Sequence, residues 1–234
     1  MSGVDVVLVW HTPLENALMA MDVSAGRIRP EEYMECYEML DDHWLEYTRR
    51  VREEPDKFWS LVSKYPQVLE HVWVSMLLID IPTFIMWQIT RHRMISWMVE
   101  SHRHVAIKEK PSIPDTVKDN TRLHEAIRFI WLHGYKIYKQ LLDEGYPKEL
   151  ARLVLPPVDS RIILASGNLR AWLELLCFRL NANSQKETKL LAEKILEALD
   201  KAYRGLKANF GTVCRNMYKY RMPREECKEE KKHG

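Results

Sequence analysis

The chain has 234 residues, of which 46% are hydrophobic and 29% charged, and its 35 basic residues nearly balance 33 acidic ones. This length is enough to bury a sizeable core in one domain, and eight Trp, ten Tyr and eleven Met exclude a disordered chain. The net charge of +2 argues against a molecule that binds nucleic acid over its whole surface, so any basic site must be local.

The first half of the chain predicts two strands among helices. Val-rich residues 4–9 are typical of a buried strand, and Pro82 is typical of a helix start after the apolar run before it. The expected elements, in chain order, are a strand over 4–9, a helix over 13–21 capped by Thr12, helices over 30–47 and 55–64, a strand over 71–81, and a helix from Pro82 to the Arg-His-Arg of 91–93.

The second half predicts mainly helices after an irregular stretch. Residues 94–115 contain no clear element and carry many charged groups, which favours a functional site there. The remaining expected elements are helices over 122–142 and 147–155, a short strand over 161–165, and helices over 168–180 and 185–206. We expect an α+β fold, a small antiparallel sheet flanked by helices with a helical C-terminal part, in a single domain over residues 1–222. A charged tail over 223–234 is expected to be flexible.

The cysteines and the N-terminus bear on the compartment. The four cysteines, Cys36, Cys177, Cys214 and Cys227, form no CxxC pair and have no His at zinc-finger spacing. We therefore expect neither a disulfide framework nor a structural zinc site, and the apolar neighbours of Cys177 indicate a core position. The opening residues lack the features of an export signal, and the longest apolar run, near 72–81, is too short to span a bilayer. A cytoplasmic protein without a membrane segment is expected.

The segment most informative about chemistry is RHRMISWMVESHRHV, residues 91–105, with three Arg, three His and two Ser. The planar guanidinium of Arg offers five donors that suit phosphates and the acidic edges of planar rings. A second cluster, Arg152, Arg170 and Arg179, lies on otherwise apolar stretches. From the residues alone, the first segment is an anion-binding cradle or a solvated basic loop. An Arg of the second cluster is either extended to solvent or held by an acidic partner or a ligand.

These motifs resemble the flavin-dependent thymidylate synthases. The family hallmark, RHR followed after two residues by Ser and then by Ser-x-Arg, is matched by Arg91-His92-Arg93, Ser96 and Ser101-His102-Arg103. The likeness extends in order along most of the chain. The further matching features are Thr12-Pro13, Glu70-His71, Pro82, Gln88, ARLVLP at 151–156, Asn168 with Arg170, and Arg179 followed by Gln185 and Glu187.

The resemblance implies a reductive methylation of dUMP to dTMP. Methylenetetrahydrofolate would supply the carbon and reduced FAD the hydride, with NADPH reducing the flavin; no protein nucleophile and no metal are required. Arg179 would be catalytic, polarising the pyrimidine as negative charge develops on it. The dUMP-binding residues implied are Gln88, Arg91, Ser101, Arg103, Arg152 and Arg179. The FAD-binding residues implied are His71, Arg91, His92, Arg93, Asn168, Arg170 and Asn183, the last standing where the family usually has His. The family also implies a homotetramer whose sites are shared between subunits.

The chain departs from the family pattern within the hallmark segment. Met98 and Val99 stand where the family usually has Asn and Glu, and His102 and His104 replace Gly and Tyr. Glu100, one residue later, would substitute for the missing Glu if the loop is shifted. An alternative is therefore a divergent flavin- or nucleotide-binding homologue without synthase activity.

Two less favoured alternatives use the same segment. The Arg/His loop with Trp87 and Trp97 as stacking platforms would bind nucleic acid, an interpretation that the balanced overall charge disfavours. His102 and His104 with His92 and Glu100 have the ligand types of a metal site, although clustered cations make a poor site for another cation.

Overall fold

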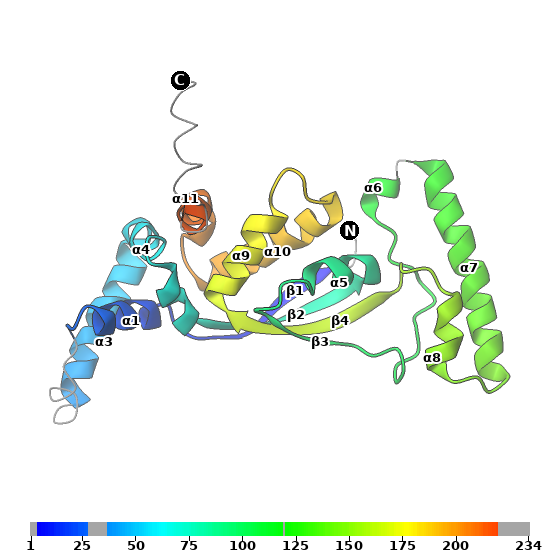
Figure 1. Ribbon diagram of the computed structural model, residues 1–234, viewed down its shortest axis with the longest axis horizontal. Helices are drawn as coiled ribbons and strands as arrows, with labels where there is room; N and C mark the ends of the chain where they lie inside the picture. Colours follow the sequence, from blue (N-terminus) through cyan, green and yellow to red (C-terminus); the bar gives the residue numbers. More distant parts are fainter. Residues whose placement is uncertain (1–3, 28–36, 119, 220–234) are drawn as a thin grey trace, which may run out of the picture.

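A computed structural model describes residues 4–27, 37–118 and 120–219. It confirms the α+β prediction: a small antiparallel sheet carries helices on one face and at both ends (Figure 1). The charged tail over 223–234 and the expected helix start at Pro30 lie outside the described residues.

The sheet contains the strands β1 (Asp5–His11), β2 (Trp73–Pro82), β3 (Ser96–Val99) and β4 (Ser160–Asn168). Its strand order is β1-β2-β4-β3, and every neighbouring pair is antiparallel. β3 lies in the stretch that we expected to contain no element. It has only four residues, and its partner β4 is remote in sequence, so a local pattern could not identify it. The ladder between β2 and β4 is irregular between Leu78 and Ile81, where Asp80 adopts a φ of 54°.

The helices are α1 (Glu15–Ser24), α3 (Tyr37–Glu53), α4 (Pro55–Val62), α5 (Thr83–Ile89), α6 (Asp115–Lys118), α7 (Thr121–Asp143), α8 (Lys148–Ala151), α9 (Leu169–Arg179), α10 (Lys186–Ala202) and α11 (Leu206–Lys219), with 3-10 turns η1 (Pro66–His71) and η2 (Arg152–Val154). Two expectations about the helices need correction. Thr12 does not cap α1; its hydroxyl accepts the Trp73 amide at 2.8 Å and joins β1 to β2. The helix expected over 185–206 ends at Ala202, because Gly205 turns the chain at a φ of 79° and a separate helix, α11, follows.

The main core lies between the sheet and the helices α5, α9 and α10, which cover one of its faces (Figure 1). On α9, Leu169, Trp172, Leu173 and Leu176 form the buried face that packs in this core. A smaller core at one end joins α7 and α8, with Trp131 and Tyr138 at its centre. No described helix combines the length and the apolar character needed to cross a membrane.

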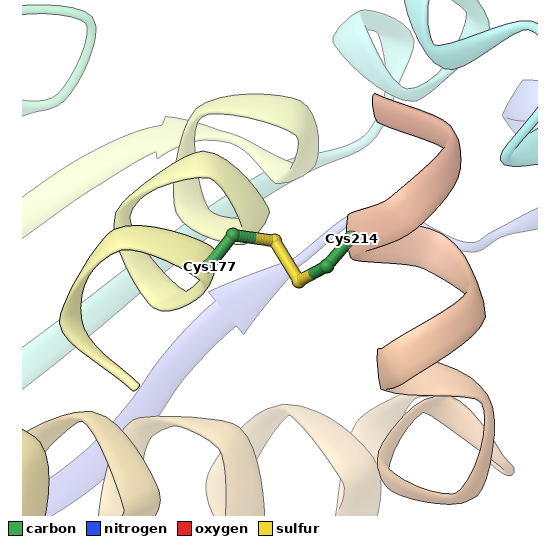
Figure 2. Close-up of a disulfide and its surroundings, with 2 residues drawn as sticks. All are labelled: Cys177 and Cys214. Atoms are coloured by element: carbon green, nitrogen blue, oxygen red, sulfur yellow. A yellow bond between two sulfur atoms is a disulfide. The ribbon is translucent and has the colours of Figure 1, made fainter. Parts of the chain in front are cut away.

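A disulfide joins Cys177 on α9 to Cys214 on α11, with Cα atoms 5.7 Å apart (Figure 2). This corrects the expectation that the cysteines form no disulfide and that Cys177 only fills the core. The two residues are separated by 37 positions, so their pairing depends on how two helices pack and leaves no local spacing motif. Because disulfides are rare in reducing compartments, the cysteines no longer support the expectation of a cytoplasmic protein.

The other face of the sheet carries no helix of the described chain (Figure 1), and it presents a row of apolar side chains next to a row that contains Ser75, Ser166 and Ser96. Strand register aligns Val7, Leu77, Leu164 and Met98 in one row across all four strands. Val7 is 43% exposed, Leu164 41% and Met98 73%. A contiguous apolar row of this kind is typical of a surface that another polypeptide covers.

Candidate functional site

The C-terminal end of α9 and the Arg-His-Arg turn after α5 meet through Arg179. Its Nε donates to His92 Nε2 at 3.2 Å, and its Nη2 donates to the Gln88 carbonyl oxygen at 2.6 Å. These bonds hold the guanidinium in one orientation at the edge of the core. Burial lowers the pKa of Arg179, but a guanidinium stays charged in proteins. The hydrogen-bond partners of Arg179 are thus an imidazole and a backbone carbonyl, so that it is neither fully extended into solvent nor paired with an acidic residue of the described chain.

His92 is held neutral in this cluster. Burial and the adjacent charge of Arg179 lower the pKa of His92 to about 4. Because Nε2 accepts a hydrogen bond from Arg179, the ring proton must lie on Nδ1. The turn itself is fixed by Trp97, whose indole Nε1 donates to the His92 carbonyl at 3.0 Å. Gly167 on β4 contributes by its lack of a side chain, since a Cβ there would lie 3.1 Å from Ile95 Cγ1.

Gln88 is oriented by the start of α10. Its amide nitrogen donates to the Gln185 side-chain oxygen, and its amide oxygen accepts the Thr188 hydroxyl at 2.9 Å. Gln185 belonged to the sequence pattern noted above. Thr188 was not part of that pattern. A Thr on the buried face of a helix carries no sequence motif that would indicate a functional role. Gln88, His92 and Arg179 thus form one hydrogen-bonded group, called the Arg179 cluster below.

A second group surrounds the turn at Ser101–Arg103. The amides of His104 and Val105 both donate to the Ser101 carbonyl at 3.0 Å, which closes the turn. Arg103 projects outward, with Nε 3.8 Å from the Glu149 carboxylate. We call residues 101–105 the Ser101 turn.

The Ser101 turn borders a cavity of about 440 Å³ between α5, residues 101–107 and η2. Its polar lining includes Arg152, Arg161, His102 and Asp159, with Trp87 and Met86 among the apolar residues. Gly134 on α7 allows η2 to approach, because a Cβ there would lie 2.8 Å from the Val154 carbonyl oxygen. The cavity brings Arg152 together with the Ser101 turn, two of the features expected at a nucleotide.

Asp159 organises the polar wall of this cavity. Its carboxylate accepts the Thr83 hydroxyl at 2.9 Å and lies 3.3 Å from Arg161 Nη2 and 3.1 Å from His102 Nδ1. Burial alone would raise the pKa of Asp159, but His102, Thr83 and Arg161 outweigh it and hold the pKa below its usual value. Sequence reasoning singled out none of Thr83, Asp159 or Arg161 for a functional role, because a lone Asp after two prolines has no motif.

The remaining residues expected at the flavin lie apart from the cavity. Asn168 caps α9, its side-chain oxygen accepting the Ala171 amide at 2.9 Å. Arg170 is held by acidic partners, 2.6 Å from Glu70 and 3.4 Å from Glu174. The residues exposed to solvent are His71, Arg91, Arg93 and Asn183. Within the described part of the chain, these two Arg form no ion pair with an acidic residue.

The departures from the family pattern have clear positions. Met98 points to the uncovered face of the sheet, whereas Val99 packs against the main core. Glu100 extends the pairing with β4: its amide donates to the Ile162 carbonyl at 2.9 Å, and its carboxylate accepts the Ile162 amide at 3.2 Å. The Glu100 carboxylate is therefore engaged at the sheet and is not directed into the cavity described above. Among the described residues, no group of three or more His, Cys, Asp or Glu is arranged to hold a metal ion.

Known proteins match this chain over most of its length. The sequence family described as "Thymidylate synthase complementing protein" matches residues 6–203. A flavin-dependent thymidylate synthase of Sulfurisphaera tokodaii is 29% identical over 177 residues, which cover 73% of this chain and 68% of that protein. A flavin-dependent thymidylate synthase of Saccharolobus solfataricus is also 29% identical over 177 residues, which cover 73% of this chain and 67% of that protein.

A solved structure shares the fold. The UMP/dUMP methylase PolB from Streptomyces cacaoi, bound with 5-Br dUMP, superposes with a TM-score of 0.69 at 20% identity, covering 88% of this chain and 95% of that one. The family match confirms the resemblance drawn from the sequence, and the names of the relatives bear out the prediction of a methyltransferase enzyme. With residues 6–203 matched, the chain belongs to the thymidylate synthase complementing protein family.

Proposed function

We propose that the protein is a flavin-dependent thymidylate synthase that converts dUMP to dTMP, with methylenetetrahydrofolate as carbon donor, FAD as the hydride-transferring cofactor and NADPH as its reductant. The observation that carries this proposal is the Arg179 cluster. A cationic guanidinium is held at fixed orientation beside a neutral His, at the end of an apolar helix. Such a group suits the stabilisation of negative charge on a planar ring.

The cavity beside the Ser101 turn supports dUMP as the substrate. Arg152 lines it, and the Ser101 hydroxyl and the exposed Arg103 lie on its bordering turn. Charge-assisted hydrogen bonds to phosphate contribute about 1.5–3 kcal/mol each, so these groups would favour a phosphorylated nucleoside. Gln88, Arg91 and Arg179 would complete the nucleotide site from the Arg179 cluster side.

A flavin cofactor is supported by the names of the relatives and by the donors available. When bound, FAD would supply the redox chemistry. The side chains proposed to hold its phosphates and ring are His71, Arg91, His92, Arg93, Asn168, Arg170 and Asn183. The exposed guanidinium groups of Arg91 and Arg93 suit a dinucleotide's two phosphates. Arg170 would first have to exchange Glu70 for the cofactor, because that carboxylate lies 2.6 Å away.

A homotetramer would bring these separated groups together. Within one chain, the proposed FAD residues His71 and Arg170 lie near the start of α9, whereas Arg179 lies at its end. The uncovered apolar row of Val7, Leu77, Leu164 and Met98 supports association with further copies of the chain. Light scattering is expected to give about 111 kDa, four times the chain mass of 27.8 kDa. A stable monomer with full activity would contradict sites shared between subunits.

The absorption spectrum of the purified protein tests the proposal first, followed by titration with dUMP and an assay of dTMP formation. We expect a yellow protein, or one that binds added FAD, a spectrum that changes with dUMP, and dTMP as product. A colourless protein without FAD binding by calorimetry would eliminate the proposed function.

A second candidate is a homologue that binds flavin and nucleotide without synthase activity. It is favoured by β3, where Met98 and Val99 replace the polar residues usual in the family and Glu100 is engaged by Ile162. This candidate predicts the same yellow protein and a spectral response to dUMP. The dTMP assay with methylenetetrahydrofolate and NADPH separates the two, since only the synthase forms product.

A further inference from the structure

His102 is a buried side chain with an incompletely satisfied polar atom. Its residue is 2% exposed, and it lines the 440 Å³ cavity. Nδ1 lies 3.1 Å from the Asp159 carboxylate, but the two are poorly aligned for a hydrogen bond, and no other described residue provides one. A buried polar group of this kind requires an explanation.

The contacts of Asp159 and Arg161 reach the chain on both sides of Ser101. Arg161 Nη1 donates to the Glu100 carbonyl at 3.3 Å, one residue before Ser101. His102, one residue after Ser101, lies against Asp159, and Arg161 Nη2 lies 3.3 Å from the same carboxylate. The residue that precedes Ser101 and the residue that follows it therefore both contact one ion pair at the start of β4, formed by Asp159 just before the strand and Arg161 within it.

The same ion pair is connected to α5. Arg161 Nε and the Asp159 carboxylate both bond to the Thr83 hydroxyl, at 3.0 and 2.9 Å. The Thr83 amide also donates to the Asp159 carbonyl at 2.9 Å. Helix α5 contains Gln88, so Asp159 and Arg161 join the Ser101 turn to an element that contributes to the Arg179 cluster.

We propose that His102, Asp159 and Arg161 are positioning residues that fix the Ser101 turn at the cavity before a nucleotide phosphate binds. The proposal rests on the proposed function, in that the turn binds dUMP. A turn that is already ordered avoids the entropic cost of ordering on binding. The His102 Nδ1 is poorly aligned with the Asp159 carboxylate, and we expect this hydrogen bond to become better aligned when the ligand is bound.

Two measurements on the full-length protein test this proposal. Hydrogen exchange of the His104 and Val105 amides, both bonded to the Ser101 carbonyl, reports the order of the turn without ligand. Calorimetric titration with dUMP, and separately with FAD, reports binding. For His102→Ala we expect faster exchange of these amides and a dUMP Kd about tenfold higher, the entropic cost of ordering roughly one backbone residue. FAD affinity is expected to remain unchanged, whereas the melting temperature should fall modestly, because a buried side chain is lost.

Two further variants make the result specific. His102→Asn places an amide donor near the Nδ1 position and is expected to restore both exchange protection and dUMP affinity. His104→Ala removes an exposed imidazole from the same turn and is expected to change neither. Unchanged exchange and dUMP affinity in His102→Ala would overturn the proposal, as would loss of protection throughout the protein in both His102 variants.

Failure of the proposed function would be distinct. If the wild-type protein binds no dUMP, the nucleotide assignment fails, and the exchange measurement alone then decides whether His102 orders the turn. Retained exchange protection in His102→Ala would then overturn the positioning role as well.

Discussion

The Arg179 cluster and the Ser101 turn are built by different means. Arg179 is fixed by its own side-chain bonds to His92 and Gln88, at the end of a helix packed on the main core. The Ser101 turn is fixed through its neighbours, by the buried pair of Asp159 and Arg161, while Arg103 projects outward with 64% of its side chain exposed.

This difference has a chemical interpretation. A group that stabilises developing charge must be oriented before the reaction, since reorganisation at that moment raises the barrier. A group that binds a phosphate from solvent must stay accessible and can complete its bonds on binding. The Arg179 cluster has the first character and the Ser101 turn the second, so substitutions in the two regions should affect turnover and binding differently.

The largest effect is expected for Arg179→Ala. Removal of one electrostatic donor to a charged transition state lowers turnover by about 10²–10³, and Arg179→Lys should restore little because an ammonium lacks the planar fork. Single-turnover oxidation of reduced FAD, with saturating dUMP and folate, measures the effect. Arg49→Ala, an exposed Arg paired with Glu46, is the control. Wild-type turnover in Arg179→Ala would refute the catalytic assignment.

Loss of the disulfide should destabilise the region that supports Arg179. Closing a loop across 37 positions corresponds to about 4 kcal/mol in the chain-entropy description. We expect the free energy of unfolding, measured by urea titration, to be lower by about this amount in the Cys177→Ser/Cys214→Ser variant. The wild-type protein should lose the same stability when a reductant is added. The variant itself should not respond to reductant. Equal stability of the oxidised and reduced wild-type protein would show that the bond contributes nothing.

Arg152→Ala tests the cavity side of the comparison. Loss of one charge-assisted hydrogen bond to phosphate should raise the dUMP Kd by about 10- to 100-fold, while turnover at saturating dUMP changes little. Calorimetry gives the Kd and steady-state kinetics the turnover, with Arg128→Ala on α7 as the control. A fall in turnover with unchanged dUMP affinity would place Arg152 in the chemical step instead.

A pH dependence of stability is expected from His92. Its pKa falls from 6.5 in the unfolded chain to about 4 in the folded one, so the unfolded state binds the proton first. This contribution to stability is complete above pH 6.5 and is lost as the pH falls from 6.5 to about 4. Urea unfolding at several pH values should show that the free energy of unfolding falls less steeply with decreasing pH in His92→Gln than in the wild type. Parallel declines would indicate that His92 does not titrate in this range.

Local sequence patterns predicted the parts of the fold that depend on neighbouring residues. The first strand was found, although most of its residues are exposed and not buried as predicted, and the Pro82 helix start and the helix expected over 168–180 were also found. The elements that were missed depend on distant partners. β3 is defined by pairing with β4, and Cys177 is paired by the packing of α11.

The same distinction applies to the candidate site. Arg179 was identified through a family motif, but the sequence left open whether it faces solvent, because the answer lies in His92 and the Gln88 carbonyl far along the chain. Asp159 was missed entirely. Its importance comes from three contacts, with Thr83, His102 and Arg161, that only the folded chain brings together.

The bond between Cys177 and Cys214 also closes the backbone into a ring that contains Arg179 and the whole of α10. A protease that cuts the exposed residues 181–183 between α9 and α10 would therefore not release a fragment, because the two pieces stay covalently joined. The nicked protein would migrate as one band on a denaturing gel until it is reduced. Arg179 lies two residues from Cys177. It would stay joined to the N-terminal piece by the backbone and to the C-terminal piece through the disulfide.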